Sequence, residues 1–424
     1  MTFRGPLLQA IRRRGATITA CAAENDGAVI DALASWGVRY AALPLRRAGL
    51  SPRADWRYCD ALLQLMREEK PDAVLAYTHK PVIYSALAAA RAEMKPRMYA
   101  MITGLGFAFI ESGTFKQRLA GAVVRFLYRR ASRHLSGVIF QNPDDQALFR
   151  KLRLVRPETS QIIVRGSGID LEQFAFAPLG ELRNAEMLKT ETLKRASETE
   201  LKTEVRDRMS AFSISDVSIS ALPIRFLLIA RLLGDKGIRE YVAAARLIKA
   251  QHPTAEFHLV GPTDPNPAAI KLSEVQGWHD EGVIQFHGTQ SDVRPFLRDC
   301  TVYVLPSYRE GTPRTVLEAM AIGRPVITTD APGCKETLFD AGSADSAGVR
   351  QGLNGFLVPV KSIDALVAAM RRFIDDPALA PKMGAEGRRL AEEHYDVHKV
   401  NAQIMEFMGL GGGAAPSDAE RLTC

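Results

Sequence analysis

Two glutamates, Glu310 and Glu318, are separated by seven residues in the segment PSYREGTPRTVLEAMAIGRP, residues 306–325. The apolar run before it, residues 301–305, predicts a buried strand, so the segment should contain the loop that leaves this strand and the helix that follows. Open α/β sheets bind ligands at that edge. Helical spacing would place both carboxylates on one face, about two turns apart, where each can accept hydrogen bonds from ligand hydroxyls.

The turn between the two glutamates, Gly311, Thr312 and Pro313, favours an anion. It lets the backbone approach closely, and the first turn of the following helix, near Thr315, exposes unpaired N–H groups that attract phosphate. A ligand with hydroxyls at two ends and a phosphate between them is a nucleotide sugar. The alternative is a pair of solvated helix carboxylates, which is the usual fate of glutamate.

Two cations, Arg231 and Lys236, follow the strand expected at residues 224–230. Breaking a sugar–diphosphate bond builds negative charge on the departing phosphate, and a transferase that uses no metal needs fixed cations there. At an effective dielectric near 20, each cation could contribute a few kcal/mol at about 4 Å. Their loss should therefore lower turnover more than donor affinity. Lone basic residues after a strand are otherwise usually solvated.

The elements that must position these residues form two alternating series of strands and helices, which predict doubly wound parallel sheets. In the first series, strands are expected at 16–21, 39–43, 73–77, 97–102 and 137–140, with helices near 5–14, 26–35, 54–69, 81–92, 114–133 and 143–152. In the second, strands are expected at 224–230, 255–260, 283–286, 301–305, 325–328 and 355–358, with helices at 236–250, 267–276, 292–298, 315–322, 333–339, 362–374 and 379–393.

The domain boundaries follow from these series. We expect one domain at 1–177 and a second at 224–395, because a chain of 424 residues is too long for one ordinary core. Residues 178–223, rich in Glu and Lys, predict a charged helical linker or, alternatively, a partner-binding helix. A last helix at 396–410 should cross back to the first domain, and the tail 411–424 should be disordered.

The segment 306–325 resembles the donor-site signature of retaining glycosyltransferases of family 4, which have the two-domain GT-B fold. RLLGDKG, residues 231–237, and Gly261, Pro262 and Gly288 stand where that family's donor domain would have them. In the first half, PLLQAIRRRG, YTHKPVIYS, MITGLGFAF, VIFQNPDDQALF and GSGIDLEQF resemble the subgroup that makes bacterial surface polysaccharides. The match covers nearly the whole chain, except about residues 178–222 and the last fifteen or so.

The resemblance implies that domain 1–177 binds the acceptor and that domain 224–395 binds the donor. It also implies roles for single residues. Glu318 would bind the ribose hydroxyls of a UDP-sugar, Glu310 the transferred sugar, and the backbone near Gly311–Thr315 the diphosphate. Gly261 and Gly288 would shape the base pocket, although a tight turn explains isolated glycines equally well. The family's retaining chemistry is commonly described as front-face attack, in which the leaving phosphate takes the acceptor proton, so neither a protein base nor a metal is expected.

In the first half, candidates for acceptor binding follow two expected strands. His79 could orient the sugar or acceptor, or be structural, and Lys80 could contact an acceptor diphosphate. Thr103, Gly104 and Gly106 permit close backbone approach, although a GxG after a strand is weak evidence. Family members begin with a strand before the first helix, whereas this chain opens directly with the helix. Either the start codon lies upstream of Met1, or the first domain folds without its first strand.

A net charge of +7 suits acidic partners, but no nucleic-acid motif accompanies it. Helix 115–134 mixes apolar residues with six basic ones, which is typical of an interfacial helix on anionic lipid; packing on the sheet would explain the apolar residues alone. A polyprenyl-diphosphate-linked sugar would then be the acceptor. Five scattered cysteines, with no metal-ligand spacing, are expected to be reduced. No signal peptide or spanning segment is recognised, so we expect a cytoplasmic, peripheral protein.

The sequence thus predicts a retaining hexosyltransferase that moves a hexose or N-acetylhexosamine from a UDP-sugar to a lipid-linked acceptor. Two alternatives remain open. A nucleotide-sugar epimerase or hydrolase of the same architecture would consume the donor without an acceptor. A donor-binding assembly partner would bind UDP-sugar without turnover.

Overall fold

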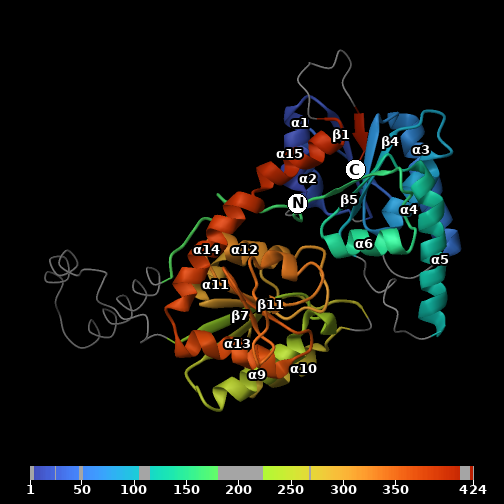
Figure 1. Cartoon of the computed structure of the whole chain (residues 1–424). Coiled ribbons are helices and arrows are strands. Elements are labelled where there is room, and N and C mark those ends of the chain that lie inside the picture. Colours follow the sequence, from blue (N-terminus) through green and yellow to red (C-terminus); the bar gives the residue numbers. More distant parts are fainter. Residues whose placement is uncertain are drawn as a thin grey trace, which may run out of the picture. The chain divides into compact units, whose positions relative to one another are not determined.

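The computed structural model describes residues 4–23, 25–46, 51–104, 115–179, 223–266, 269–410 and 421–423. The chain divides into two compact units, each shown in Figure 1. The first contains residues 1–168, 310–312 and 397–424, and the second contains residues 169–309 and 313–396. Of the expected linker 178–223, residues 180–222 lie outside the described residues.

The first unit is built on a parallel sheet of seven strands in the order β2-β1-β14-β3-β4-β5-β6. Neighbouring strands pair in parallel, so their carboxyl ends lie at the same edge of the sheet. The strands are β1 (Thr17–Ala22), β2 (Arg39–Ala42), β3 (Ala73–Tyr77), β4 (Arg97–Ile102), β5 (Gly137–Phe140), β6 (Ser160–Ile163) and β14 (Arg421–Thr423).

Successive side chains of a strand point to opposite faces of the sheet, and in this sheet those on both faces are apolar. Helices therefore cover both faces. Val74 and Ala76 of β3 join the core with α3 and α4, whereas Leu75 joins the core with α1 and α15 on the other face. The helices are α1 (Gly5–Arg13), α2 (Gly27–Ser35), α3 (Pro52–Glu69), α4 (His79–Ala89), α5 (Phe115–Ala131), α6 (Pro143–Lys151) and α15 (Val397–Phe407).

The middle of the first sheet differs from the sequence prediction. The end of the expected disordered tail, Arg421–Thr423, forms β14, which pairs in parallel with β1 on one side and β3 on the other. The sheet is therefore continuous where a strand was expected to be missing. Residues 411–420 of that tail lie outside the described residues.

The second unit contains another seven-stranded sheet, in the order β12-β13-β11-β10-β7-β8-β9. All neighbouring strands are parallel except β12 and β13, which are antiparallel. The strands are β7 (Arg225–Ile229), β8 (Glu256–Val260), β9 (Gln285–Phe286), β10 (Val302–Leu305), β11 (Val326–Thr329), β12 (Arg350–Gly352) and β13 (Gly355–Val358).

This second sheet is also covered on both faces. Phe226 and Leu228 of β7 pack in a core with α9 and α13, while Leu227 and Ile229 pack with α12 and α14. In Figure 1 these two pairs of helices lie on opposite sides of β7. The fold class predicted from the alternating series is thus observed in each unit. The helices are α9 (Ile238–Lys249), α10 (Leu272–Asp280), α11 (Arg294–Asp299), α12 (Arg314–Ile322), α13 (Ile363–Asp375) and α14 (Leu379–His394).

The differences in secondary structure are local. Strands β6 and β12 were not predicted, because their sequences, SQII and RQG, are short and are not continuous apolar runs. The helix expected at 267–276 begins at Leu272 as α10, and that expected at 333–339 is only a 3-10 turn, Lys335–Thr337. Side-chain caps fix other helix starts well: Asn142 accepts a hydrogen bond from the Asp145 N–H at the start of α6.

Candidate functional site

The candidate donor site lies at the point of the second sheet where the strand order reverses. From β7 the chain proceeds through β8 and β9 in one direction, and from β10 through β11 and β13 in the other, while β7 and β10 are paired neighbours. Ligands bind outside the carboxyl ends of strands at such a switch point. The loops that leave β7 and β10 carry Lys236 and the segment that begins at Pro306.

These two loops are held together by hydrogen bonds. The Tyr308 N–H donates to the Asp235 carbonyl oxygen at 2.8 Å, and the Ser307 hydroxyl donates to the same oxygen at 3.1 Å. Gly237 lies between them with φ of +70°, and a Cβ added there would come within 2.1 Å of the Pro306 carbonyl oxygen. Only glycine fits this position, because both its backbone conformation and its space exclude a side chain.

The two predicted cations, Arg231 and Lys236, both lie on the loop that follows β7. Arg231 donates from its guanidinium to the Asp264 carboxylate at 2.7 Å, and its side chain is 60% exposed. Lys236 ends a 3-10 turn, Gly234–Lys236, directly before Gly237 and is half-buried. Asp235 of the same loop accepts the hydrogen bonds from Ser307 and Tyr308. The role of the two cations at the phosphate stays a prediction.

Glu318 is buried rather than solvated. Its side chain is 7% exposed and accepts a hydrogen bond from Arg314 Nε at 2.9 Å, one helical turn earlier in α12. Burial raises the pKa of the Glu318 carboxyl, and the Arg314 guanidinium opposes that rise. A carboxylate in this position is poorly hydrated, so hydroxyl donors from a ligand would be bound more strongly than at the surface.

Thr315 stands in the first turn of α12, beside the phosphate position expected there. Its hydroxyl accepts a hydrogen bond of 2.5 Å from Tyr303 of β10. Pro313, which is buried, is the N-cap of α12 and precedes the helix with an extended backbone. In the first turn of α12 the Val316 N–H donates to the Pro313 carbonyl oxygen at 3.1 Å. The start of a helix favours an anion in general, so phosphate binding here stays a prediction.

Glu310 does not belong to the helix that carries Glu318, because α12 begins only at Arg314. The prediction that helical spacing puts both carboxylates on one face is therefore wrong. By its contacts the tripeptide Glu310–Thr312 groups with the first unit. There the Asn142 side-chain amide donates to the Gly311 carbonyl oxygen at 2.9 Å, and the Thr312 hydroxyl donates to the Gln141 carbonyl oxygen at 3.2 Å.

The two glycines predicted near the base are joined by a backbone hydrogen bond of 2.8 Å, from the Gly261 N–H to the Gly288 carbonyl oxygen. A Cβ on Gly261 would come within 1.8 Å of the Ala230 carbonyl oxygen, so this residue lets the ends of β7 and β8 approach. A Cβ on Gly288 would meet no atom within 4 Å. Their base-binding role stays a prediction.

In the first unit the predicted acceptor residues have partners. His79 begins α4, and its Nδ1 lies 2.8 Å from the Tyr128 hydroxyl. Lys80 donates to the Asp55 carboxylate at 2.7 Å, in a pair whose side chains are 15% and 5% exposed. Thr103 and Gly104 follow β4 and are half-buried. Gly106 lies outside the described residues.

The sequence did not predict which carboxylates pair with Arg231 and Lys80. Asp264 and Asp55 lie 33 and 25 residues from the cations they bind, and no local pattern connects them. Arg314 could have been found, because it precedes Glu318 by four residues and such pairs face each other on a helix.

Two protein-family models match the chain. Residues 4–165 match the family described as "Glycosyl transferase 4-like domain", and residues 223–376 match "Glycosyl transferases group 1". The chain belongs to the GT4-like glycosyltransferases. The two matches lie on either side of the expected linker. They cover every strand of the two sheets except β14, and the loops that carry the candidate residues.

Among curated relatives of this glycosyltransferase is the N,N'-diacetylbacillosaminyl-diphospho-undecaprenol alpha-1,3-N-acetylgalactosaminyltransferase of Campylobacter jejuni, 27% identical over 339 residues and 80% of each chain. A putative colanic acid biosynthesis glycosyltransferase of Salmonella typhimurium is 27% identical over 47% of this chain and 48% of its own. The solved structure of Anabaena HepE in complex with UDP is 19% identical, with a TM-score of 0.67 over 96% of both chains. The predicted GT-B fold is confirmed.

Two surveys of the described ranges complete the site. Within them, His, Cys, Asp and Glu side chains do not gather in groups of three or more that could hold a metal ion. None of the helices in those ranges is both long and apolar enough to cross a bilayer.

Proposed function

We propose that this glycosyltransferase moves a hexose or N-acetylhexosamine from a UDP-sugar to a polyprenyl-diphosphate-linked acceptor, with retention of configuration and without a metal. The observation that carries the proposal is the switch point of the second sheet. There the loop with Arg231 and Lys236 is hydrogen-bonded to the loop that leads into α12, which holds the buried Glu318.

The donor end of the proposal rests on the chemistry of these groups. Glu318 would accept hydrogen bonds from the ribose hydroxyls, and the first turn of α12 near Thr315 would bind the diphosphate. Gly261 and Gly288 would border the base. A UDP donor is further supported by the Anabaena neighbour, which was solved with UDP.

The proposed reaction needs few protein groups. The bond between the sugar C1 and the diphosphate oxygen breaks, and a bond forms between C1 and the acceptor hydroxyl oxygen on the same face. The hydroxyl proton passes to the departing phosphate. Arg231 and Lys236 stabilise the negative charge on that phosphate, and this effect is largest in the transition state. Glu310 would orient the transferred sugar, and His79 and Lys80 would serve the acceptor.

The lipid-linked acceptor is supported by the surface of α5. Leu119, Val123 and Phe126 recur at helical spacing on one side of α5, and they are 58%, 40% and 64% exposed. Val124 and Leu127 pack against the core instead, so the apolar residues of the helix divide between two faces. Exposed Arg129, Arg130 and Arg133 accompany the outer face. Such a helix suits the anionic inner face of the cytoplasmic membrane.

Vesicle binding tests this part of the proposal. Phe126→Ser should weaken co-sedimentation with phosphatidylglycerol vesicles about tenfold, since burying a Phe side chain is worth about 1.5–3 kcal/mol. The matched control is Leu247→Ser, because Leu247 is 48% exposed on α9 of the second unit. Equal binding by the wild type and the Phe126 variant would refute membrane docking through α5.

The decisive experiment incubates purified protein with radiolabelled UDP-sugars and a bacterial membrane lipid extract. We expect label to enter the organic phase in a time-dependent way. A changed free sugar without lipid labelling would identify an epimerase or hydrolase. UDP-sugar binding without turnover would identify an assembly partner. The anomeric configuration of the lipid product, read by NMR, tests retention, and chelation with EDTA tests metal independence.

A further inference from the structure

The guanidinium of Arg231 is both paired and exposed. It donates from Nη1 to Oδ2 of Asp264 at 2.7 Å, yet the Arg231 side chain is 60% exposed and that of Asp264 only 10%. A guanidinium carries five N–H donors, so one bond to a carboxylate does not exhaust its capacity. The pair therefore has a buried end and an exposed end that can still donate to a ligand.

Asp264 is held by its own loop, which follows β8. Its Oδ1 accepts a hydrogen bond of 2.9 Å from the Asn266 N–H, while Oδ2 accepts from Arg231. Such a bond from an aspartate to the backbone two residues later fixes the side chain locally. Both carboxylate oxygens are thus engaged, and the carboxylate is the anchor of the pair.

The same loop also fixes the backbone beside Arg231. The Leu232 N–H donates to the Pro262 carbonyl oxygen at 2.9 Å, and the Leu232 carbonyl oxygen accepts from the Ile270 N–H at 2.8 Å. Leu232 itself is fully buried. The backbone next to Arg231 and the tip of its side chain are therefore both bound by the loop that follows β8, although Arg231 follows β7.

Stability does not account for this arrangement. An ion pair with an exposed partner contributes little to folding, because water and salt screen it. Charge alone does not account for it either, since a carboxylate beside a cation weakens the attraction of that cation for a phosphate. The pair supplies orientation instead. A long side chain that already points in one direction loses less conformational freedom when it binds.

We propose that Asp264 is a positioning residue, which holds the Arg231 guanidinium so that its other N–H groups meet the departing phosphate. This inference rests on the proposed function and deepens it, because it adds a residue of the β8 loop to the donor site. Donors that are oriented in advance need no reorganisation as negative charge develops. The planar guanidinium suits this role better than an ammonium, which is a compact point charge without a fixed fork.

A double-mutant cycle in turnover tests the coupling. Asp264→Ala should lower kcat about tenfold, which corresponds to about 1.4 kcal/mol, while UDP affinity falls no more than about threefold. Asp264→Asn keeps one acceptor oxygen and should recover part of the loss. In an Arg231→Ala background neither change at Asp264 should lower kcat further, because a positioning residue acts only through its partner.

The matched control is Glu69→Ala in the first unit. The Arg39–Glu69 pair has nearly the same exposure, 68% and 11%, and a length of 2.9 Å, but Glu69 ends α3, away from the donor loops. Its loss should change neither kcat nor UDP affinity. Thermal unfolding of each variant verifies folding, and Asp264→Asn carries the cycle if the alanine variant does not fold.

Three results would overturn the proposal. An unchanged kcat would mean that Arg231 needs no anchor. A higher kcat would mean that Asp264 competes with the phosphate for the guanidinium. An equal loss in the presence and in the absence of Arg231 would mean that Asp264 acts on the fold of its loop.

Calorimetric UDP titration separates this inference from the proposed function. If the wild type transfers sugar but the cycle is additive, the positioning role fails alone. If the wild type transfers sugar to no acceptor, the proposed function fails, and the same cycle is measured in UDP affinity. Asp264→Ala should then weaken UDP binding about threefold with Arg231 present and leave it unchanged in the Arg231→Ala background. Any other pattern would overturn the positioning role.

Discussion

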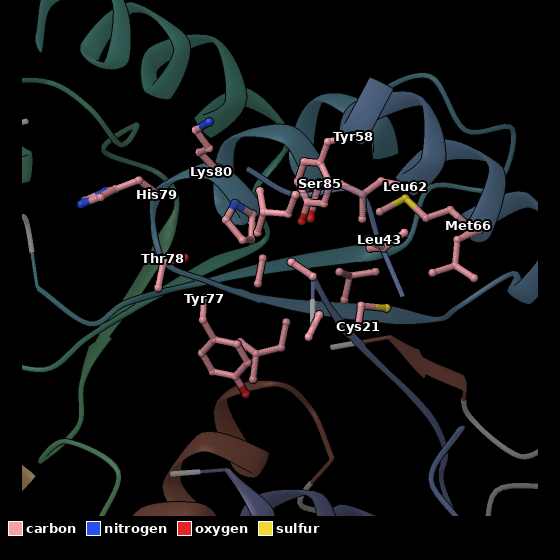
Figure 2. A pocket seen from close by; sticks show the side chains of 18 residues that line it. Cys21, Leu43, Tyr58, Leu62, Met66, Tyr77, Thr78, His79, Lys80 and Ser85 are labelled. Atoms are coloured by element: carbon pink, nitrogen blue, oxygen red, sulfur yellow. The ribbon is translucent and has the colours of Figure 1, made fainter. Parts of the chain in front are cut away.

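The switch points of the two sheets differ in one respect, which is whether the central strands touch. In the second unit β7 and β10 are paired, and their loops are joined by hydrogen bonds to the Asp235 carbonyl oxygen. In the first unit, where the order reverses between β1 and β3, these strands are separated by the three-residue β14, and a cavity opens beyond it (Figure 2). One topology thus gives two hydrogen-bonded loops where the strands meet and an apolar cavity where they do not.

The two units also differ in how their buried ion pairs are built. Lys80 and Asp55 come from two helices, so their ion pair ties α4 to α3. Glu318 and Arg314 lie one turn apart on α12, so their pair can separate without unpacking any element. We therefore expect the first pair to serve stability and the second to exchange its partner for a ligand.

Removal of Asp55 should have the largest effect on stability. Asp55→Ala leaves the Lys80 charge buried without its partner and should lower the free energy of unfolding by about 3–5 kcal/mol. Urea denaturation measures this loss. Asp60→Ala is the control, because the Asp60–Arg91 pair is 51% exposed on both sides and should cost less than about 1 kcal/mol. Equal losses would contradict the structural role of the Lys80 pair.

Lys236→Ala tests the charge stabilisation at the second switch point. Turnover should fall at least about a hundredfold while UDP affinity stays within about tenfold, since the phosphate charge grows in the transition state. Steady-state kinetics and calorimetric UDP titration give the two numbers. Lys271→Ala, at an exposed position, should change neither. Equal losses in turnover and affinity would mean simple ground-state binding.

Glu318→Ala tests the exchange of partners on α12. UDP at about 100 times its dissociation constant should stabilise the wild type by about 2.7 kcal/mol, and the variant should lose this protection in a thermal shift. Glu386→Ala is a suitable control, because Glu386 binds Arg389 at the surface of α14. Unchanged protection of the Glu318 variant would remove the ribose assignment.

Thr78→Gly tests for backbone strain directly before α4, where Thr78 lines the cavity. Glycine accepts a φ of +63° without steric cost, so the variant should be about 1 kcal/mol more stable than the wild type. The matched change Thr17→Gly, in regular β1, should instead destabilise the protein by about 0.5–1 kcal/mol. Chemical denaturation compares them, and a loss of stability in both variants would exclude strain at Thr78.

The smallest expected effect is a pH dependence at Glu318. Because burial raises its pKa in the folded state, the folded protein holds this proton to higher pH than the unfolded chain. Stability from this group is therefore lost as pH rises from the ordinary glutamate value, about 4.3, through the raised folded value. Glu318→Gln removes the titration, so its stability relative to wild type should increase over that window. A constant difference between the two denaturation curves would show that the pKa is not raised.

Much of the fold was predictable because its signals are local. Strands β3, β4, β5 and β13 were predicted with their observed bounds, since each is an apolar run between turn residues. The helix that carries Glu318 was also placed correctly. Lys236 was expected to begin a helix, but it ends a 3-10 turn, and α9 begins at Ile238. The helical relation of Glu310 to Glu318 was wrong, because the Gly-Thr-Pro turn lies between Glu310 and α12, which begins at Arg314.

The amino-acid sequence by itself determined the two alternating series, the charged residues at the strand ends and the family, because periodicity and motif spacing depend on near neighbours along the chain. Only the tertiary structure decided which cations are paired, that Glu318 is buried, and that β14 enters the first sheet between β1 and β3. Those outcomes depend on groups tens to hundreds of residues apart. Their energies come from burial and from contacts across the fold, which local sequence does not encode.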